Sequence, residues 1–182
     1  MRPLILLAAA ALAACAGLRP SGPPPRPLPA SIRTLSLPPI VNKSQEPGLE
    51  DPLALALRDE FLRDGRRPLV PEKDSDGAVQ VAITRYLLTP LQYDANQNPT
   101  TYLIRVNVEV QLFDRAAKKT LWDEKGLEAS LAYPNASLTG GLTEQAAQAQ
   151  LWPVLAPMIV ARVIDGYGAT AAPEPKPAPP GP

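Results

Sequence analysis

Side chains able to do covalent or acid–base chemistry are scarce in this chain. It has 182 residues, with a single cysteine at position 15 and no histidine. The lack of histidine removes the commonest general base and the commonest metal ligand. One cysteine cannot form an internal disulfide, and a free thiol is a liability in an oxidising compartment. Covalent modification of the Cys15 thiol would remove that difficulty.

Carboxylates are the remaining candidates for catalysis. Asp123 and Glu124 are the adjacent acidic pair on a predicted strand, and neighbours on a strand point to opposite faces, so the two cannot act on one substrate. The sequence has no Gly-x-Ser-x-Gly motif, no phosphate-binding loop and no metal-ligand spacing. We therefore predict a protein that is not an enzyme and needs no cofactor or metal. A hydrolase using two carboxylates or a serine is the weaker alternative.

The residues before Cys15 have the features of a bacterial signal peptide. Arg2 is positive, an apolar run extends from Leu4 to Leu12, and the two residues before the cysteine are small alanines. The run is too short to span a bilayer, which needs about 20 apolar residues. A cysteine at this place resembles the lipobox of bacterial lipoproteins, whose thiol is diacylated before cleavage. Residues 1–14 are thus predicted to be a lipoprotein signal peptide; an ordinary secretory signal with an incidental cysteine is the alternative.

The lipobox resemblance also implies a location. Stable anchoring takes at least two acyl chains, at roughly 0.8 kcal/mol per buried methylene, so a triacylated Cys15 holds a protein firmly at a membrane. In lipoproteins generally, an Asp after the cysteine retains the protein at the inner membrane, whereas Ala16 follows here. We expect lipid anchoring through Cys15 at the periplasmic face of the outer membrane.

Composition sets the domain boundaries. Lys and Arg number 18 and Asp and Glu number 18, and this zero net charge gives no support for a nucleic-acid partner. Prolines cluster near both ends of the chain. Residues 15–29 are predicted to form a lipidated, proline-rich linker, and residues 169–182 a disordered, proline-rich tail. The folded domain is predicted to span residues 30–168.

The first half of this domain reads as a strand and a helix. Residues 31–40 form a short apolar run that Pro38 and Pro39 must end, which is typical of an edge strand. Asp51 followed by Pro52 predicts a helix N-cap. Leu53, Leu57 and Phe61 then recur every four residues as one apolar stripe, and Gly65 is predicted to end the helix.

The second half reads as three strands and a final helix. Apolar residues alternate over 79–87, with Val79, Val81, Ile83 and Leu87 on one face, and again over 102–112; residues 120–133 alternate more weakly. The short turns between these segments require antiparallel pairing. Residues 143–164 predict a helix, although Pro153 and Pro157 leave open whether it is kinked or split in two.

The order of elements is β-α-β-β-β-α. One apolar sheet face and two amphipathic helices predict an α+β fold, a two-layer sandwich with a mostly antiparallel four-stranded sheet and two helices on one face.

Several strings in this order resemble the LptE family of lipopolysaccharide-assembly lipoproteins. They are LSLPPIVNKSQEPGLE (35–50), LRDEFLRDG (57–65), YDANQN (93–98), Tyr102 at the start of the long strand, and LWDE (121–124). The resemblance covers nearly all of residues 15–167 and implies a two-helix, four-stranded sandwich. It also implies a role as a plug inside the large outer-membrane β-barrel LptD, where the protein assists barrel assembly and delivery of lipopolysaccharide to the outer leaflet.

Two loops are candidates for the barrel contact. A barrel lumen is lined by polar, hydrogen-bonding groups, which suits the amide- and tyrosine-rich loops of this chain. The predicted partner-binding residues are Tyr93, Asp94, Asn96, Asn98, Tyr133 and Asn135. Asn and Pro are also ordinary turn residues, so a purely structural role for each is an open alternative.

Cations are the candidates for contact with lipopolysaccharide, because phosphates prefer Arg and Lys donors. No Lys or Arg occurs in residues 86–104 or 126–161. The predicted lipopolysaccharide-binding residues are therefore Arg85, Arg105, Arg115, Lys118 and Lys119. The alternatives are a solvated turn for the last three, and pairing with Glu109 or another acid for the first two.

A different class of partner also fits these features. Other periplasmic binding lipoproteins, such as activators of cell-wall synthases or auxiliary subunits of lipid transporters, combine a lipobox with a small α+β domain. The protein that co-purifies with this chain would distinguish these classes.

Overall fold

A computed structural model describes residues 28–166 of the chain. The predictions for the signal peptide, for Cys15 and most of its linker, and for the C-terminal tail lie outside the described residues. The folded elements are, in order, β1 (Leu35–Ser36), β2 (Val41–Asn42), α1 (Glu50–Asp64), the short 3₁₀ helix η2 (Glu72–Asp74), β3 (Gly77–Tyr93), β4 (Pro99–Asp114), β5 (Lys119–Pro134) and α2 (Glu144–Asp165).

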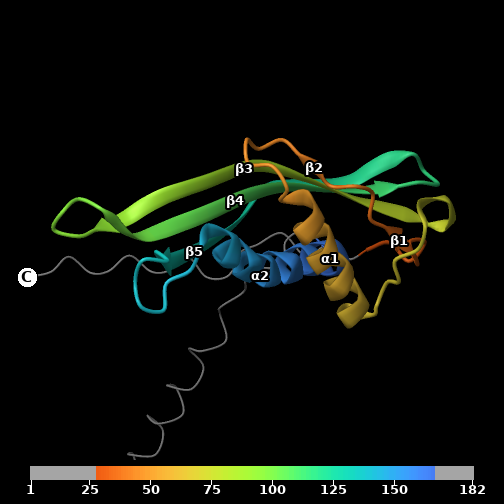
Figure 1. The fold of residues 1–182 in the computed structure, drawn as a ribbon. Coiled ribbons are helices and arrows are strands. Elements are labelled where there is room, and N and C mark those ends of the chain that lie inside the picture. Colours follow the sequence, from red (N-terminus) through yellow and green to blue (C-terminus); the bar gives the residue numbers. More distant parts are fainter. Residues whose placement is uncertain (1–27, 167–182) are drawn as a thin grey trace, which may run out of the picture.

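The predicted α+β sandwich is confirmed. Strands β3, β4 and β5 form the antiparallel meander, and both helices lie on one face of the sheet (Figure 1). The core lies between these two layers and is built from inward side chains of all three long strands and both helices.

The predicted edge strand over residues 31–40 is instead two short strands. Pro38 and Pro39 cannot donate ladder hydrogen bonds, and they separate β1 from β2. Both strands pair with β3 in parallel, with Leu35 opposite Gly77 and Val41 opposite Ala82. The described sheet therefore has five strands and mixed pairing, with β5 at one edge.

A β-bulge in β3 changes which residues face the helices. The register shifts between Ile83 and Arg85, so that Tyr86 packs against the core beyond the shift. The alternation predicts Leu87 on the buried face, and this is wrong. Leu87 lies opposite Arg105 on the open face of the sheet, because the extra residue reverses the inside–outside pattern.

The apolar stripe of α1 is confirmed, since Leu53, Leu57 and Phe61 are buried. Gly65 ends the helix with a φ of 67°, and its N–H donates to the Phe61 carbonyl at 3.0 Å. The N-cap is Leu49, not Asp51 as the sequence predicts. Pro52 lies in the first turn, where a missing N–H costs no helical hydrogen bond.

Helix α2 is continuous through both prolines. The Thr143 side chain caps its start by accepting from the Ala146 N–H at 3.2 Å. A proline has no N–H to donate to the carbonyl four residues earlier, so Pro153 and Pro157 leave the carbonyls of Ala149 and Pro153 without helical donors. Ala149 and Pro153 are both exposed, on the side of the helix away from the core. By length and composition alone α2 could cross a membrane, but half of its apolar stretch is buried in the fold.

An ion pair joins α2 to the sheet. Arg162 Nε lies 3.8 Å from Glu124 Oε2, and their side chains are only 16% and 15% exposed. Asp123 lies on the other face, where it pairs with exposed Lys125. The two adjacent carboxylates thus point to opposite faces of the sheet, as the strand pattern predicts.

Candidate functional site

The free end of the β3–β4 hairpin extends past the helices and carries the predicted loop (Figure 1). We call residues Leu91–Asn98 the hairpin tip. All of these residues are exposed. The tip is held in place by the pairing of β3 with β4, which runs from Gly77 opposite Asp114 to Tyr93 opposite Pro99. Because this end lacks a helix layer, both of its faces are open to a partner.

Asp94 organises the hairpin tip. Its carboxylate accepts from the backbone N–H groups of Asn96 at 2.8 Å and Asn98 at 2.9 Å, and from the Asn98 side-chain amide at 3.1 Å. These bonds, those from Asn98 most of all, hold the pKa of Asp94 below its usual range. Asp94 and Asn98 therefore shape the turn, while the exposed side chains of Tyr93 and Asn96 remain available to a partner.

Tyr133 and Asn135 lie at the base of the same hairpin. Tyr133 is only 4% exposed and stacks on Tyr102, with ring centroids 5.8 Å apart. Burial raises the pKa of Tyr133, with the nearby Glu144 charge as a smaller cause. Asn135 donates through its side chain to the Pro99 carbonyl at 3.3 Å and through its backbone N–H to Thr100 at 2.9 Å. Both residues fasten the end of β5 to the hairpin.

A second link, which the sequence did not reveal, joins the hairpin to α2. The Tyr86 hydroxyl donates to Glu144 Oε1 at 2.6 Å and accepts from Gln148 Nε2 at 3.0 Å. Burial raises the pKa of the Tyr86 hydroxyl. The spacing of Glu144 and Gln148 by four residues is a signal that they share a helix face. The bulge that turns Tyr86 toward them has no such signal.

Exposed apolar side chains accompany the amides at this end. Leu88, Leu91 and Leu138 are all substantially exposed, Leu91 by 49%. With no Lys or Arg in residues 86–104 or 126–161, the hairpin end is a surface of leucines, amides and tyrosine without cations, and Asp94 is the charged residue of its tip. Such a composition suits a protein partner better than a phosphate.

The five predicted cations do not form one cluster. Arg85 and Arg105 are exposed on the open face of the sheet, where Arg105 Nε lies 4.0 Å from Glu128 Oε1. The pairing partner of Glu109 is Lys43, at 3.3 Å. Arg115, Lys118 and Lys119 lie at the β4–β5 turn, at the end of the sheet opposite the hairpin tip (Figure 1). Arg115 contacts both the carbonyl and the carboxylate of Glu72.

Within residues 28–166, no group of three or more potential ligands could hold a metal ion. The exposed amides, tyrosine and leucines of the hairpin end can recognise a partner by hydrogen bonds and apolar contact.

The loop after β5 depends on a close backbone approach at Gly141. A Cβ placed there would lie 1.8 Å from the Asn135 carbonyl oxygen. We expect Gly141→Ala to force this loop away from the hairpin base and to lower the free energy of unfolding by about 1–3 kcal/mol, measured by urea denaturation. Gly140→Ala is the control, because space is open there and only its φ of 76° is strained. Equal losses in the two variants would contradict the close-approach explanation.

Comparison with known proteins identifies the family. The model of the lipopolysaccharide-assembly family LptE matches residues 32–165. The chain belongs to this family. No curated protein sequence matches the chain.

Three solved structures are similar to the chain, and the first of them, with a TM-score above 0.5, shows the same fold. The hypothetical protein CT253 from Chlamydia trachomatis is 15% identical, with a TM-score of 0.52 over 71% of this chain and 94% of that one. A minor lipoprotein from Acinetobacter baumannii is 20% identical, with a TM-score of 0.49 over 74% and 92% of the two chains. Rare lipoprotein B from Shewanella oneidensis is 16% identical, with a TM-score of 0.40 over 68% and 89%.

Proposed function

We propose that this chain is an outer-membrane lipoprotein, anchored through Cys15, that plugs the LptD β-barrel and assists its assembly. In this role it supports delivery of lipopolysaccharide to the outer leaflet. The observation that carries the proposal is the match of the LptE family model to residues 32–165. The signal-peptide pattern that ends at Cys15 is what such a lipoprotein requires.

The hairpin tip is the proposed barrel contact. It extends beyond the helix layer (Figure 1) and exposes Tyr93 and Asn96 beside Leu91. Amides and a tyrosine hydroxyl can hydrogen-bond to a polar lumen wall, while the leucine adds apolar contact. Tyr133, Asn135, Asp94 and Asn98 contribute to this contact by holding the tip and its base in shape.

Contact with lipopolysaccharide is proposed at the dispersed cations. Among the described residues, Arg85, Lys118 and Lys119 take part in no ion pair, so their donors are open to phosphate. Arg105 and Arg115 already have acidic neighbours. A phosphate bound at Arg105 or Arg115 must therefore compete with Glu128 or Glu72.

Affinity purification tests the proposal. We expect the tagged chain, purified from detergent-solubilised outer membranes, to bring a large β-barrel with it in near-stoichiometric amount. Leu91→Lys places a charge in the contact, and we expect it to lower the recovered barrel by about tenfold, as for a buried anchor of an interface. Leu55→Lys is the matched control, because Leu55 is 60% exposed on α1, away from the hairpin.

Two results would contradict the proposal. Recovery of a cell-wall synthase or a lipid-transporter subunit without a barrel would assign the chain to another class of binding lipoprotein. Equal barrel recovery by Leu91→Lys and Leu55→Lys would exclude the hairpin tip as the contact.

A further inference from the structure

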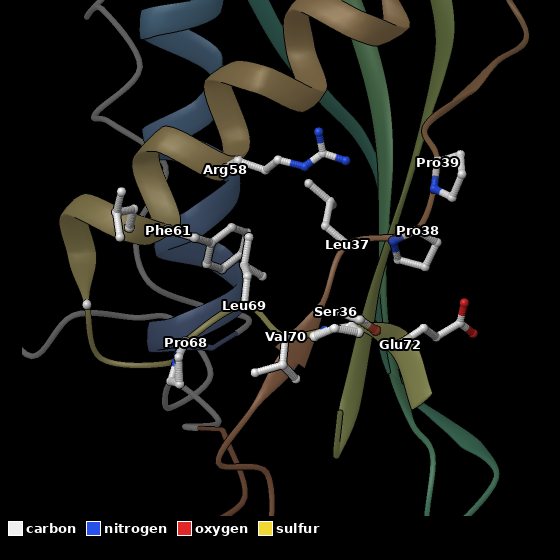
Figure 2. A pocket seen from close by; sticks show the side chains of 13 residues that line it. Ser36, Leu37, Pro38, Pro39, Arg58, Phe61, Pro68, Leu69, Val70 and Glu72 are labelled. Atoms are coloured by element: carbon white, nitrogen blue, oxygen red, sulfur yellow. The ribbon is translucent and has the colours of Figure 1, made fainter. Parts of the chain in front are cut away.

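A groove lies on the side of the fold away from the hairpin tip. It has a volume of about 780 Å³ and runs between the C-terminal half of α1 and two chain segments, residues 36–39 and 68–72. Figure 2 shows Phe61 and Leu69 on one side of the space and Leu37 and Pro38 on the other, with the Arg58 side chain extending over it. This volume is in the range of pockets that bind small ligands or short peptide segments.

The lining is apolar and poor in backbone donors. Four prolines contribute to it, Pro38, Pro39, Pro68 and Pro71, and none has an N–H to offer. Leu62 lies at the groove and is 83% exposed. A proline-rich segment suits such a surface, because it packs through its rings and brings carbonyl acceptors without needing backbone partners.

The C-terminal segment of the same chain begins beside this groove. Arg66 Nη1 lies 2.5 Å from Asp165 Oδ1 in the last turn of α2, and Arg66 directly follows Gly65 of the groove lining. A smaller hollow beside the end of α2 is lined by Leu28, Arg66, Arg67 and Ile164. The segment that follows Gly166 therefore starts next to the part of the fold that forms the groove.

Charge favours the C-terminal segment over the N-terminal one. Among the described residues Arg58 takes part in no ion pair, whereas Glu72, the other charged lining residue, pairs with Arg115. Residues 167–182 contain one acid, Glu174, and one cation, Lys176, so their side chains carry no net charge. In an extended polyproline conformation of about 3.1 Å per residue, residues 167–174 reach about 25 Å. Residues 16–27 contain Arg19 and Arg26 and no acid, so Arg58 would repel them.

We propose that the proline-rich segment 167–182 binds in this groove, with Glu174 facing Arg58. The segment covers Leu62 and joins the end of α2 to the outer side of α1. This contact is independent of the barrel-binding proposal, because it lies on the side of the fold away from the hairpin tip.

Photo-crosslinking in the full chain tests the occupant. A photoreactive amino acid replaces Leu62, and the crosslinked peptides are identified by mass spectrometry. We expect an intramolecular crosslink to residues 167–182. The same replacement at Leu55 is the control, because Leu55 is exposed on α1 but does not line the groove, and we expect no such crosslink from it. A crosslink to residues 16–27, to a second copy or to another protein, or no crosslink at all, would overturn the proposal.

A charge exchange tests the proposed pairing. We expect Arg58→Glu and Glu174→Arg each to lower the crosslink yield from position 62 by about fivefold, the scale of an exposed ion pair. The combined variant is expected to restore it. Arg58 is exposed, so these variants should keep the circular dichroism spectrum of the parent. Unchanged yields in the single variants, or no recovery in the combined one, would overturn the contact between Glu174 and Arg58.

Discussion

Replacement of Cys15 by alanine is expected to remove the protein from the outer-membrane fraction. The variant has no thiol to acylate, because Cys15 is the single cysteine of the chain. Each acyl methylene lost from the bilayer removes roughly 0.8 kcal/mol of binding, and without two chains no stable anchor remains. Cell fractionation and labelling with a radioactive fatty acid measure the effect. We expect loss of the label and accumulation of an uncleaved precursor.

The variant Ala16→Asp is the control that separates the choice between inner and outer membrane from lipid attachment itself. This variant keeps the thiol, so we expect it to incorporate the label normally but to fractionate with the inner membrane. A Cys15→Ala chain that stayed in the outer membrane after a high-salt wash would contradict lipid anchoring. Fractionation of Ala16→Asp with the outer membrane would leave the anchor intact but remove the sorting argument.

Removal of Glu124 from its ion pair with Arg162 is expected to have the largest effect on the free energy of unfolding. In Glu124→Ala, the Arg162 side chain, which is only 16% exposed in the parent fold, loses its acidic partner. Removal of one member of a buried pair leaves an uncompensated charge, and we expect a loss of about 3 kcal/mol in the free energy of unfolding. Urea denaturation of Glu124→Ala and of the parent chain measures this loss.

Two further variants test the cause of that loss. Asp123→Ala removes the adjacent carboxylate on the open face, whose partner Lys125 is well exposed, and we expect a change within about 0.5 kcal/mol. The double variant Glu124→Leu with Arg162→Met replaces both charges by apolar groups and is expected to regain most of the stability. A double variant as unstable as Glu124→Ala would show that packing, not the isolated charge, causes the loss.

The helices and strands of this fold could be predicted from the sequence where the pattern that indicates them is local. The stripe of Leu53, Leu57 and Phe61 and the alternation over 102–112 both depend on neighbours within a few positions, and both are confirmed. Asp51 with Pro52 is also a local signal for a helix start, yet the helix begins two residues earlier, with Leu49 as its N-cap. The side chain of Asn42 donates to Glu50 at 2.9 Å, a contact from outside the helix that periodicity does not reveal.

Features that depend on pairing between distant segments could not be predicted from the sequence. The parallel pairing of β1 and β2 with β3 and the bulge after Ile83 arise only when the strands meet. The candidate site shows the same division. Its loop 93–98 was visible as a polar turn, whereas the fixing of Tyr86 by Glu144 and Gln148 spans about 60 positions of sequence. Polar residue types alone do not separate Asp94, which shapes the turn, from Asn96, which does not.

The two prolines of α2 have a consequence for passage through a membrane. They leave the backbone carbonyls of Ala149 and Pro153 without a helical donor, on an exposed side of the folded protein where water can serve both. In the hydrocarbon of a bilayer, each such group would cost several kcal/mol unless a neighbouring helix or a Ser or Thr side chain satisfied it, and α2 itself contains no Ser or Thr. The most apolar helix of the described fold is thereby a poor stop-transfer segment. During export, a translocation channel would release it to the far side of the membrane instead of passing it sideways into the lipid.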